Sequence, residues 1–431
     1  MNVTVGFWGV AILLLLLIAR VPVALALIAV SFGGITFLIG LNPALGIVMN
    51  TPYSFVASWT LSAVPMFLLM GFVAYHSGLT TGLFEAAKVI LRRIPGGLAV
   101  SAVFACSGFA AVSGSSLACA AAMGRIAIPE MVAAGYRPSV AAGSIAAGGT
   151  IGALIPPSIL MIIYGIIAET SVTQVFIGGI GIGILTAFSY VVVILIISWL
   201  RPDLIPRQAV EKGESSARVL VDVWPILVLI AILFGGLFSG FFSATEAGAV
   251  GALGAVILGL VTRGLTWKAM QQSLLETVLT TSSLFIIAVG AAMFTRFLGI
   301  SGLSGFLHST VAGADLSYVQ LMLIVVLIYL VLGTFMEPFG AMLVTLPVFL
   351  PILKAEGISL VWFGVLVVKL LEIGMITPPL GLNVFVIRNV AAKYATTVEI
   401  FRGVVPFFFA DLVVVFVAIA FPQVVLMLVA R

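Results

Sequence analysis

The feature that most limits the fold of this chain is its succession of apolar stretches, each about 20 residues long. A helix of about 20 apolar residues crosses the hydrocarbon core of a bilayer. Charged residues make up only 8% of the 431 residues, whereas soluble domains carry about 25%. So few charges cannot cover the surface of a water-soluble protein of this size. The sequence therefore predicts an all-α polytopic membrane protein.

The apolar segments differ in length, and two of them stand out. The first, 3–19, lacks a basic leader and a small-residue cleavage site, so we interpret it as a retained span and not as a signal peptide. The segments are 3–19, 21–41, 60–82, 98–134, 139–168, 174–200, 223–242, 246–262, 274–296, 318–353, 359–386 and 403–430. Segments 98–134 and 318–353 are too long for one crossing and short for two, and each is interrupted in its middle. We expect each to form a re-entrant hairpin of two half-length helices.

The positions of the basic residues support a particular orientation. With the N-terminus outside, ten full crossings and two hairpins, all but four of the 19 Lys and Arg residues lie on the cytoplasmic side, as the positive-inside rule requires. Arg296, Lys354 and Arg431 are the exceptions that fall outside, and Lys369 lies within a span. The longest polar stretch, 201–222, is predicted to be a cytoplasmic linker between two halves.

The two halves are related by an internal repeat. A shift of 222 residues places Gly152 on Gly374, and the pair Pro156 and Pro157 on the pair Pro378 and Pro379. The same shift places hairpin 98–134 on segment 320–356. The model puts five crossings between the hairpins, so they lie on opposite faces of the membrane. Inverted repeats of this kind are typical of secondary transporters, with the binding site between the repeats near the midplane.

Glycines and prolines interrupt the span that follows each hairpin. Glycine weakens a helix by about 1 kcal/mol and proline by about 3 kcal/mol relative to alanine, and adjacent prolines leave upstream carbonyls without donors. In a bilayer such groups need protein, water or a ligand. One break alone is equally well explained as a kink. Two breaks at one offset predict a binding site.

The chemistry of these breaks suggests what binds there. Free N–H groups at the helix N-termini of the hairpin tips attract carboxylates, and free carbonyl and hydroxyl oxygens suit a hard cation such as sodium. The alternative for any single Ser or Thr is a hydrogen bond back to its own helix. The candidates are Ser113, Ser115, Ser116, Gly148, Gly149 and Thr150 in the first half and Glu337, Gly340, Gly374, Thr377 and Asn383 in the second.

Charged residues within apolar segments are functional candidates by default. We expect Glu337, at the second tip, to help bind a cation, and we place Glu372 at the beginning of the second broken helix. Two interpretations stay open for Glu246, Lys369 and Asp411: they pair inside the protein, or they reach an interface.

Several other classes of protein are disfavoured by what the sequence lacks. It has no H-E-x-x-H, G-x-S-x-G or G-x-x-x-x-G-K-[ST] motif and no cysteine cluster, so neither an enzyme nor an ATPase is indicated. Cys106 and Cys119 are interpreted as small buried hydrophobic residues. No basic run exceeds Arg92-Arg93, which argues against a nucleic-acid partner. The energy for transport must come from an ion gradient or from a separate subunit.

Together, the motifs resemble the large membrane subunit of tripartite ATP-independent periplasmic (TRAP) transporters over essentially the whole chain. The strings that carry the resemblance are Val64-Pro-Met-Phe-Leu-Leu-Met-Gly71, Ser113-Gly-Ser-Ser116, Ala146-Ala-Gly-Gly-Thr-Ile-Gly152 with Ile155-Pro-Pro-Ser158, Thr245-Glu-Ala247, and Gly374-Met-Ile-Thr-Pro-Pro-Leu-Gly-Leu-Asn383. The chain has Ala244 where the family often has proline.

The resemblance implies a sodium-driven importer of a small carboxylate, such as a C4-dicarboxylate or sialic acid, in the bacterial inner membrane, with no cofactor beyond sodium as coupling ion. It implies two partners: a periplasmic substrate-binding protein and a small four-helix membrane subunit. In such elevator transporters a transport domain slides against a scaffold. The corresponding parts here are scaffold 1–90 and 223–310, and transport domain 91–200 (hairpin 98–134, broken helix 139–168) and 311–431 (hairpin 318–353, broken helix 359–386).

The resemblance also assigns roles to residues of both breaks. One sodium site would be framed by Ser113, Gly114, Ser115, Gly148, Gly149 and Thr150, and the other by Glu337, Gly340, Gly374, Met375 and Thr377. Substrate would lie between the tips, near Ser115, Ser116, Gly149, Pro156, Pro157, Pro338, Pro378, Pro379 and Asn383.

Three alternatives remain at the level of sequence. A stand-alone sodium/dicarboxylate symporter of similar fold would transport without a binding protein. A membrane-embedded enzyme, such as a lipid-group transferase, would need a polar catalytic cluster near one interface, and none is found. A passive scaffold subunit would not need matched helix breaks.

Overall fold

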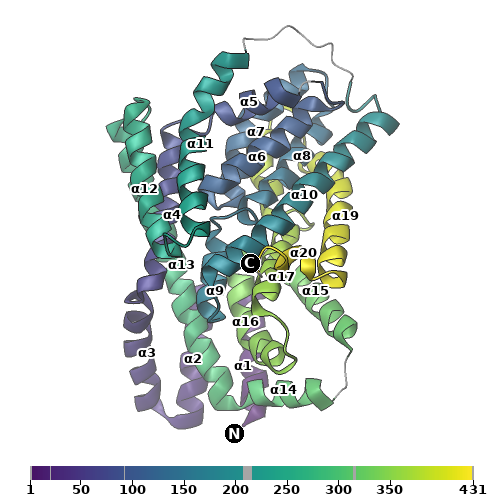
Figure 1. Ribbon diagram of the computed structural model, residues 1–431. Helices are drawn as coiled ribbons and strands as arrows, with labels where there is room; N and C mark the ends of the chain where they lie inside the picture. Colours follow the sequence, from purple (N-terminus) through teal and green to yellow (C-terminus); the bar gives the residue numbers. More distant parts are fainter. Residues whose placement is uncertain (1, 20, 92, 207–215, 314–316, 430–431) are drawn as a thin grey trace.

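A computed structural model of the chain describes residues 2–19, 21–91, 93–206, 216–313 and 317–429. Throughout these residues the secondary structure consists of helices joined by turns (Figure 1). Residues 207–215 of the predicted linker, with Arg207 and Lys212, lie outside the described residues, as do Arg20, Arg92 and Arg431. The end of that linker is helical, because α11 begins at Ser216.

Eight helices within the described residues are long and apolar enough to cross a membrane. Three of these eight, Ser116–Ala133, Tyr318–Phe335 and Pro338–Ala355, are arms of the predicted hairpins, so five of them correspond to the ten full crossings expected. The other expected crossings are shorter or broken; the first two apolar helices, for example, have 16 and 17 residues. The helices outside the hairpins and broken spans are α1 Val3–Ile18, α2 Val23–Ile39, α3 Leu41–Val56, α4 Ala63–His76, α5 Gly82–Leu91, α10 Val172–Leu200, α11 Ser216–Phe238, α12 Ala244–Val261, α13 Trp267–Ser301, α14 Leu303–Gly313, α19 Thr397–Ala420 and α20 Gln423–Leu426.

The first predicted hairpin is a helical pair broken where the sequence indicated. Helix α6 (Gly97–Ser113) ends at Gly114, whose φ of 60° is left-handed and suits a residue without a side chain. Ser115 then caps α7 (Ser116–Ala133) by accepting a hydrogen bond from the N–H of Ala118. Arms of 17 and 18 residues measure about 27 Å at 1.5 Å per residue. The expectation of half-length arms is therefore wrong, because both arms nearly match the core of a bilayer.

The second hairpin has arms of the same length but a looser arrangement. Helix α15 (Tyr318–Phe335) ends at Met336, and α16 (Pro338–Ala355) begins with a proline in its first turn. Whereas α6 packs along α7, α15 packs mainly on α17, and α16 packs on α13, α14 and α17. The two hairpins lie in opposite halves of the molecule, α6 and α7 in the upper part and α15 and α16 in the lower part of Figure 1.

Each hairpin is followed by a span that is broken as predicted. In the first half α8 (Pro138–Thr150) passes through a 3-10 turn (η2, Ile151–Ala153) and the two prolines before α9 (Ile159–Ile167). In the second half α17 (Leu360–Gly374) is followed by a turn that contains Pro378 and Pro379, and then by α18 (Leu382–Val390). Both proline pairs are joined by cis peptide bonds.

The halves interlock through the second arms of these broken helices. Helix α9 packs on α16 and α17 of the second half, and α18 packs on α7 and α8 of the first half. A separate group of helices, α2, α4, α12 and α13, packs together beside them, with α11 against α12 and α5. Each break is thus placed between its own hairpin and helices of the other half.

Candidate functional site

The tip of the first hairpin lies directly against the first helix break. A side chain at Gly114 would overlap the carbonyl oxygen of Pro157. A Cβ at Gly152 would lie 2.8 Å from the carbonyl oxygen of Ser115, closer than real side chains come. The close backbone approach therefore depends on these glycines. It brings residues 113–116 beside the end of α8, where Gly148, Gly149 and Thr150 are buried.

The serines of this tip have different hydrogen-bond partners. The hydroxyl of Ser113 is buried, and its oxygen has no hydrogen-bond partner among the described residues. Ser115 is occupied as the cap of α7, at 3.4 Å from the N–H of Ala118. Ser116 donates to the Oε1 atom of Glu372 at 3.1 Å. The first tip therefore contacts a carboxylate of the second half.

Thr150 begins a chain of hydrogen bonds that crosses the molecule. Its hydroxyl lies 2.7 Å from the carbonyl oxygen of Ala147 and 3.1 Å from the hydroxyl of Tyr190. Tyr190, on α10, donates to Oδ2 of Asp411 at 2.8 Å, and Oδ1 of Asp411 accepts from Lys369 at 2.5 Å. Lys369 and Asp411 are both fully buried. They pair inside the protein, which settles the choice that the sequence left open.

Two other charged residues also have defined positions. Glu246 is exposed and forms a capping box with Ser243 at the start of α12, so it does not pair inside the protein. Glu372 is fully buried in the last turn of α17. Its expected place at the beginning of the broken helix is wrong, because the helix begins at Leu360, more than three turns earlier.

The second break approaches the second hairpin one turn before its tip. A Cβ at Gly374 would lie 2.5 Å from the backbone of Gly333, so only two glycines allow α17 and α15 to come this close. Met375 is buried, and the hydroxyl of Thr377 donates to the carbonyl oxygen of Ile373 at 2.6 Å. Thr377 thus makes the back-bond that was the alternative to a ligand role, while its oxygen keeps a free lone pair.

At the tip itself, the predicted residues face different surroundings. Glu337 is the exposed N-cap residue of α16, and its side chain makes no cap hydrogen bond. Pro338 is buried in the first turn. Gly340 lies close to Val23 of α2, whose side chain would be 3.2 Å from a Cβ at that position. The hairpin residue that contacts Gly374 is thus Gly333, which the sequence analysis did not single out, and not a residue of the tip.

Asn383 connects the two broken helices. Its amide nitrogen donates to the carbonyl oxygen of Ala146 in α8 at 3.3 Å, and its backbone N–H donates to the carbonyl oxygen of Met375. The side-chain oxygen Oδ1 is buried without a hydrogen-bond partner among the described residues. Asn383 therefore presents one free acceptor between the halves.

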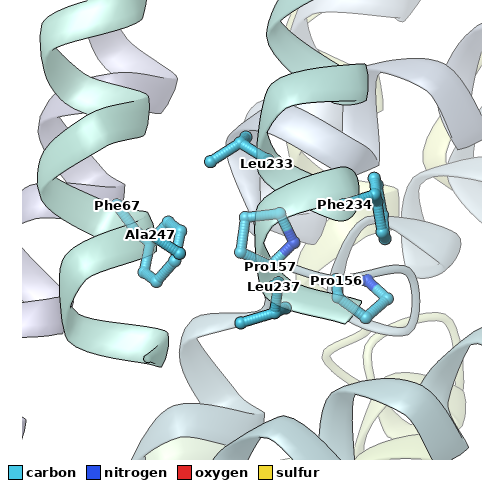
Figure 2. A pocket seen from close by; sticks show the side chains of 7 residues that line it. All are labelled: Phe67, Pro156, Pro157, Leu233, Phe234, Leu237 and Ala247. Carbon is cyan, nitrogen blue, oxygen red and sulfur yellow. The ribbon is translucent and has the colours of Figure 1, made fainter. Parts of the chain in front are cut away.

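The two proline pairs lie in unlike environments. Pro156 and Pro157 are buried, whereas Pro378 and Pro379 are exposed. The first pair forms part of the wall of a small apolar pocket (Figure 2). Its lining consists of Phe67, Pro156, Pro157, Leu233, Phe234, Leu237 and Ala247. Because every one of these side chains is apolar, this pocket offers no side-chain ligand for an ion or a carboxylate.

Sequence reasoning missed Tyr190, and it named Glu372 as a candidate for its charge without placing it beside the first tip. Tyr190 contacts Thr150, and Glu372 contacts Ser116, although both lie far from these partners in the sequence. A signal for Glu372 was present, because the repeat shift of 222 residues places it on Thr150 (372 − 150 = 222). No comparable pattern marks Tyr190.

Fold and site together define a multi-pass membrane transport protein with two hairpins and two interrupted helices. The family model of the tripartite ATP-independent periplasmic transporter, DctM component, matches residues 10–424, and the chain belongs to this family. It is therefore a TRAP transporter large permease subunit of the bacterial inner membrane, and its family consists of transporter permeases and not of enzymes.

Individual relatives and one solved structure support this assignment. The chain is 38% identical to the C4-dicarboxylate TRAP transporter large permease protein DctM of Pseudomonas aeruginosa over 360 residues, 81% of this chain and 84% of the relative. It is 32% identical to the sialic acid TRAP transporter large permease protein SiaM of Vibrio cholerae over 96% of both chains. The crystal structure of the Alcanivorax borkumensis YdaH transporter has the same fold, with a TM-score of 0.63 and 17% identity over 90% of both chains.

Proposed function

We propose that this chain imports a small carboxylate, driven by a sodium gradient, through an elevator movement of the two hairpins and two broken helices against the remaining helices. The observation that carries the proposal is the close backbone contact at Gly152 in one half and at Gly374 in the other. These glycines occupy equivalent positions in the repeat. Each holds a helix break next to its hairpin, as an ion and substrate site between inverted repeats requires.

The residues at the two breaks fit oxygen ligation of sodium and binding of an anion. Buried oxygens that have no hydrogen-bond partner within the described part of the chain occur at Ser113, Asn383 and Glu372, and hard cations are bound by oxygen ligands. Helix N-termini at Ser116 and Pro338 supply the positive ends of helix dipoles at the two tips. In this proposal sodium binds the oxygens and the substrate carboxylate lies against the N-termini.

The substrate and the partners are proposed from the relatives. Relatives are named for C4-dicarboxylate, sialic acid, ectoine or 5-hydroxyectoine, and isethionate. The first three kinds of substrate carry a carboxylate, which is the proposed substrate class, whereas isethionate is a sulfonate. A relative from Oleidesulfovibrio alaskensis is named isethionate TRAP transporter permease protein DctMQ, and the matched region covers 59% of its length. The rest of that relative is consistent with a small membrane subunit, so we propose such a subunit as one partner of this chain. We propose a periplasmic substrate-binding protein as the other, because the family is described as tripartite and periplasmic.

Reconstituted transport tests the proposal. The chain and the small subunit are inserted into liposomes, with the binding protein and radiolabelled succinate or sialic acid outside. Uptake is expected with an inward sodium gradient, and it should vanish when choline replaces sodium or the binding protein is omitted. Uptake without sodium would contradict the proposal. Sodium-dependent uptake without the binding protein would instead favour a stand-alone sodium/dicarboxylate symporter.

A further inference from the structure

A chain of four buried polar side chains joins the first arms of the two broken helices. It runs from Lys369 in α17 through Asp411 in α19 and Tyr190 in α10 to Thr150, the last residue of α8. All four side chains are fully buried. A buried ion pair often stabilises a protein no more than well-packed apolar residues of similar volume do. Stability alone therefore does not account for this pair, and its effect on the groups bonded to it has to be considered.

The direction of the hydrogen bonds in this chain follows from the number of hydrogens. The hydroxyl of Tyr190 has a single hydrogen, and a hydrogen bond to a charged acceptor is about twice as strong as one to a neutral acceptor. This hydrogen therefore goes to Oδ2 of Asp411, at 2.8 Å, while Oδ1 accepts from Lys369. In its contact with Thr150, at 3.1 Å, Tyr190 can only accept, so Thr150 is the donor.

Thr150 lies where α8 ceases to be an α-helix. In a continuous α-helix the N–H of Ile151 would bond to the carbonyl oxygen of Ala147, but it bonds to the carbonyl oxygens of the next two residues. The hydroxyl of Thr150 lies 2.7 Å from the carbonyl oxygen of Ala147 and takes the place of the missing donor. Because the same hydroxyl contacts Tyr190, it ties the last turn of α8 to α10.

We propose that Tyr190 and Asp411 are positioning residues for transport, which hold Thr150 and thereby fix the last turn of α8 at the first helix break. Asp411, with Lys369 as its counter-charge, directs the hydroxyl of Tyr190, and Tyr190 directs that of Thr150. Lys369 belongs to the second broken helix, so the chain also fixes the two breaks relative to each other. The part played in transport rests on the proposed function, whereas the fixing of α8 does not.

The test removes single hydroxyl groups from the full chain. Tyr190→Phe keeps the ring edge-on to Phe407, with 5.2 Å between the ring centroids, and Thr150→Val keeps the shape of the threonine. In detergent, each variant should raise the amide hydrogen exchange of residues 148–155 about fivefold, the factor for one ordinary hydrogen bond. Adding Tyr190→Phe to Thr150→Val should have little further effect, because the two groups share one bond.

Transport provides a second measurement. In the reconstituted uptake assay Tyr190→Phe and Thr150→Val should raise the half-saturating sodium concentration about fivefold, while the maximal rate stays nearly the same, because the first break is less well ordered before its ligands bind. If wild-type uptake needs no sodium, the proposed function fails, while the exchange rates still decide whether Tyr190 fixes α8.

A second buried tyrosine–threonine pair provides the matched control. The hydroxyl of Thr345 lies 2.6 Å from that of Tyr329 and 2.8 Å from the carbonyl oxygen of Ala341. Both residues of this pair belong to the second hairpin, not to a broken span. Tyr329→Phe should leave the exchange of residues 148–155 and the sodium titration unchanged. If it shifted them as much as Tyr190→Phe does, the effect would be a general loss of packing and the inference would be wrong.

Two double variants test the part played by Asp411. Lys369→Met with Asp411→Leu leaves Tyr190 without its acceptor, so its hydrogen turns to Thr150, and both measurements should change as in Tyr190→Phe. Lys369→Met with Asp411→Asn keeps an acceptor oxygen and should recover most of the wild-type behaviour. Equal behaviour of the two would show that Asp411 does not direct Tyr190. Unchanged exchange and an unchanged sodium titration in Tyr190→Phe and Thr150→Val would overturn the whole inference.

Discussion

The two helix breaks share a local structure but differ in what covers them. In the first half Pro156 and Pro157 are buried under α4, α11 and α12. In the second half Pro378 and Pro379 are exposed, and Leu380 after them is 41% exposed. The hairpins also differ: the arms α6 and α7 of the first pack closely on each other, whereas the arms α15 and α16 of the second make little contact with each other. The repeat thus determines where each helix breaks, and the neighbouring helices determine whether the break is buried or exposed.

This difference has a functional meaning under an elevator mechanism. Alternating access requires that the site be open on one side while the other side is sealed. If the proposed elevator mechanism holds, the buried break of the first half is the sealed side and the exposed break of the second half is the open side. The same sequence pattern can thus give a buried break in one half and an exposed break in the other. The residues that bury the first break, such as Leu233 and Leu237, belong to helix α11, which is not part of a hairpin or of a broken span.

The largest expected contrast between the halves is in chemical accessibility. Leu380 and Ser158 occupy equivalent positions of the repeat, 222 residues apart, yet Ser158 is fully buried. In a background with Cys106→Ala and Cys119→Ala, Leu380→Cys should react fully with a membrane-impermeant maleimide, whereas Ser158→Cys should not react. The measurement is a gel-shift assay on the reconstituted chain. Equal labelling of both cysteines would show that the breaks are equally open and would remove the basis of the comparison.

Replacing each proline pair is expected to abolish transport for different reasons. Alanine restores two backbone N–H groups and favours a continuous helix. Pro156→Ala with Pro157→Ala should leave the protein inserted but reduce sodium-dependent uptake to background, and it should also lower the melting temperature because the buried packing is lost. Pro378→Ala with Pro379→Ala should reduce uptake equally but leave the melting temperature nearly unchanged. Normal uptake in the first variant would mean that its break is only a kink.

The sequence could predict the breaks but not their surroundings. Glycines, prolines and the interruption of apolar segments are local signals, so the hairpin breaks at Gly114 and Glu337 and both broken spans were located correctly. Helices α3, α5 and α14 were missed because they are short or contain polar residues and proline within their length. The exposure of each break depends on helices distant in the sequence, for which a single sequence carries no periodic signal.

The same reasoning applies to the candidate site. The repeat pointed to Gly152 and Gly374 because both halves have glycine there. The contact between Ser116 and Glu372 joins residues 256 positions apart, and the pairing of Lys369 with Asp411 joins two different helices. Such partners are chosen by tertiary packing, so the sequence could identify the charged residues as important without naming their partners.

The buried ion pair is a second difference between the halves, since Ala147 occupies the position equivalent to Lys369 (369 − 147 = 222). Lys369→Met leaves Asp411 buried without its cation, which should destabilise the protein by about 3–5 kcal/mol. Adding Asp411→Asn removes both charges and keeps an acceptor for Tyr190, so most of the stability should return. Denaturant unfolding in detergent measures each value.

A pair at the surface provides the control for this prediction. Lys354 lies 3.9 Å from Glu169, with both side chains more than half exposed, and Lys354→Met should change the stability by less than about 1 kcal/mol. If Lys369→Met were equally mild, the pair in the second half would contribute no more than a surface contact, and the two halves would differ less than their charges suggest.

The smallest expected effect distinguishes the two hairpin tips. Ser115 and Glu337 are equivalent N-cap positions (337 − 115 = 222), but only Ser115 accepts a hydrogen bond from its helix. Ser115→Ala should therefore cost about 1 kcal/mol of stability, whereas Glu337→Ala should cost almost nothing.

Sodium titration of uptake separates this capping role from a role in binding. Ser171 caps α10 in the same way, with the N–H of Gln174 at 3.3 Å from its hydroxyl, but lies outside both tips. Ser171→Ala should lose similar stability without changing the half-saturating sodium concentration, while Ser115→Ala should raise it. If both serine variants titrate like the wild type, Ser115 acts only as a helix cap and is not one of the proposed sodium ligands.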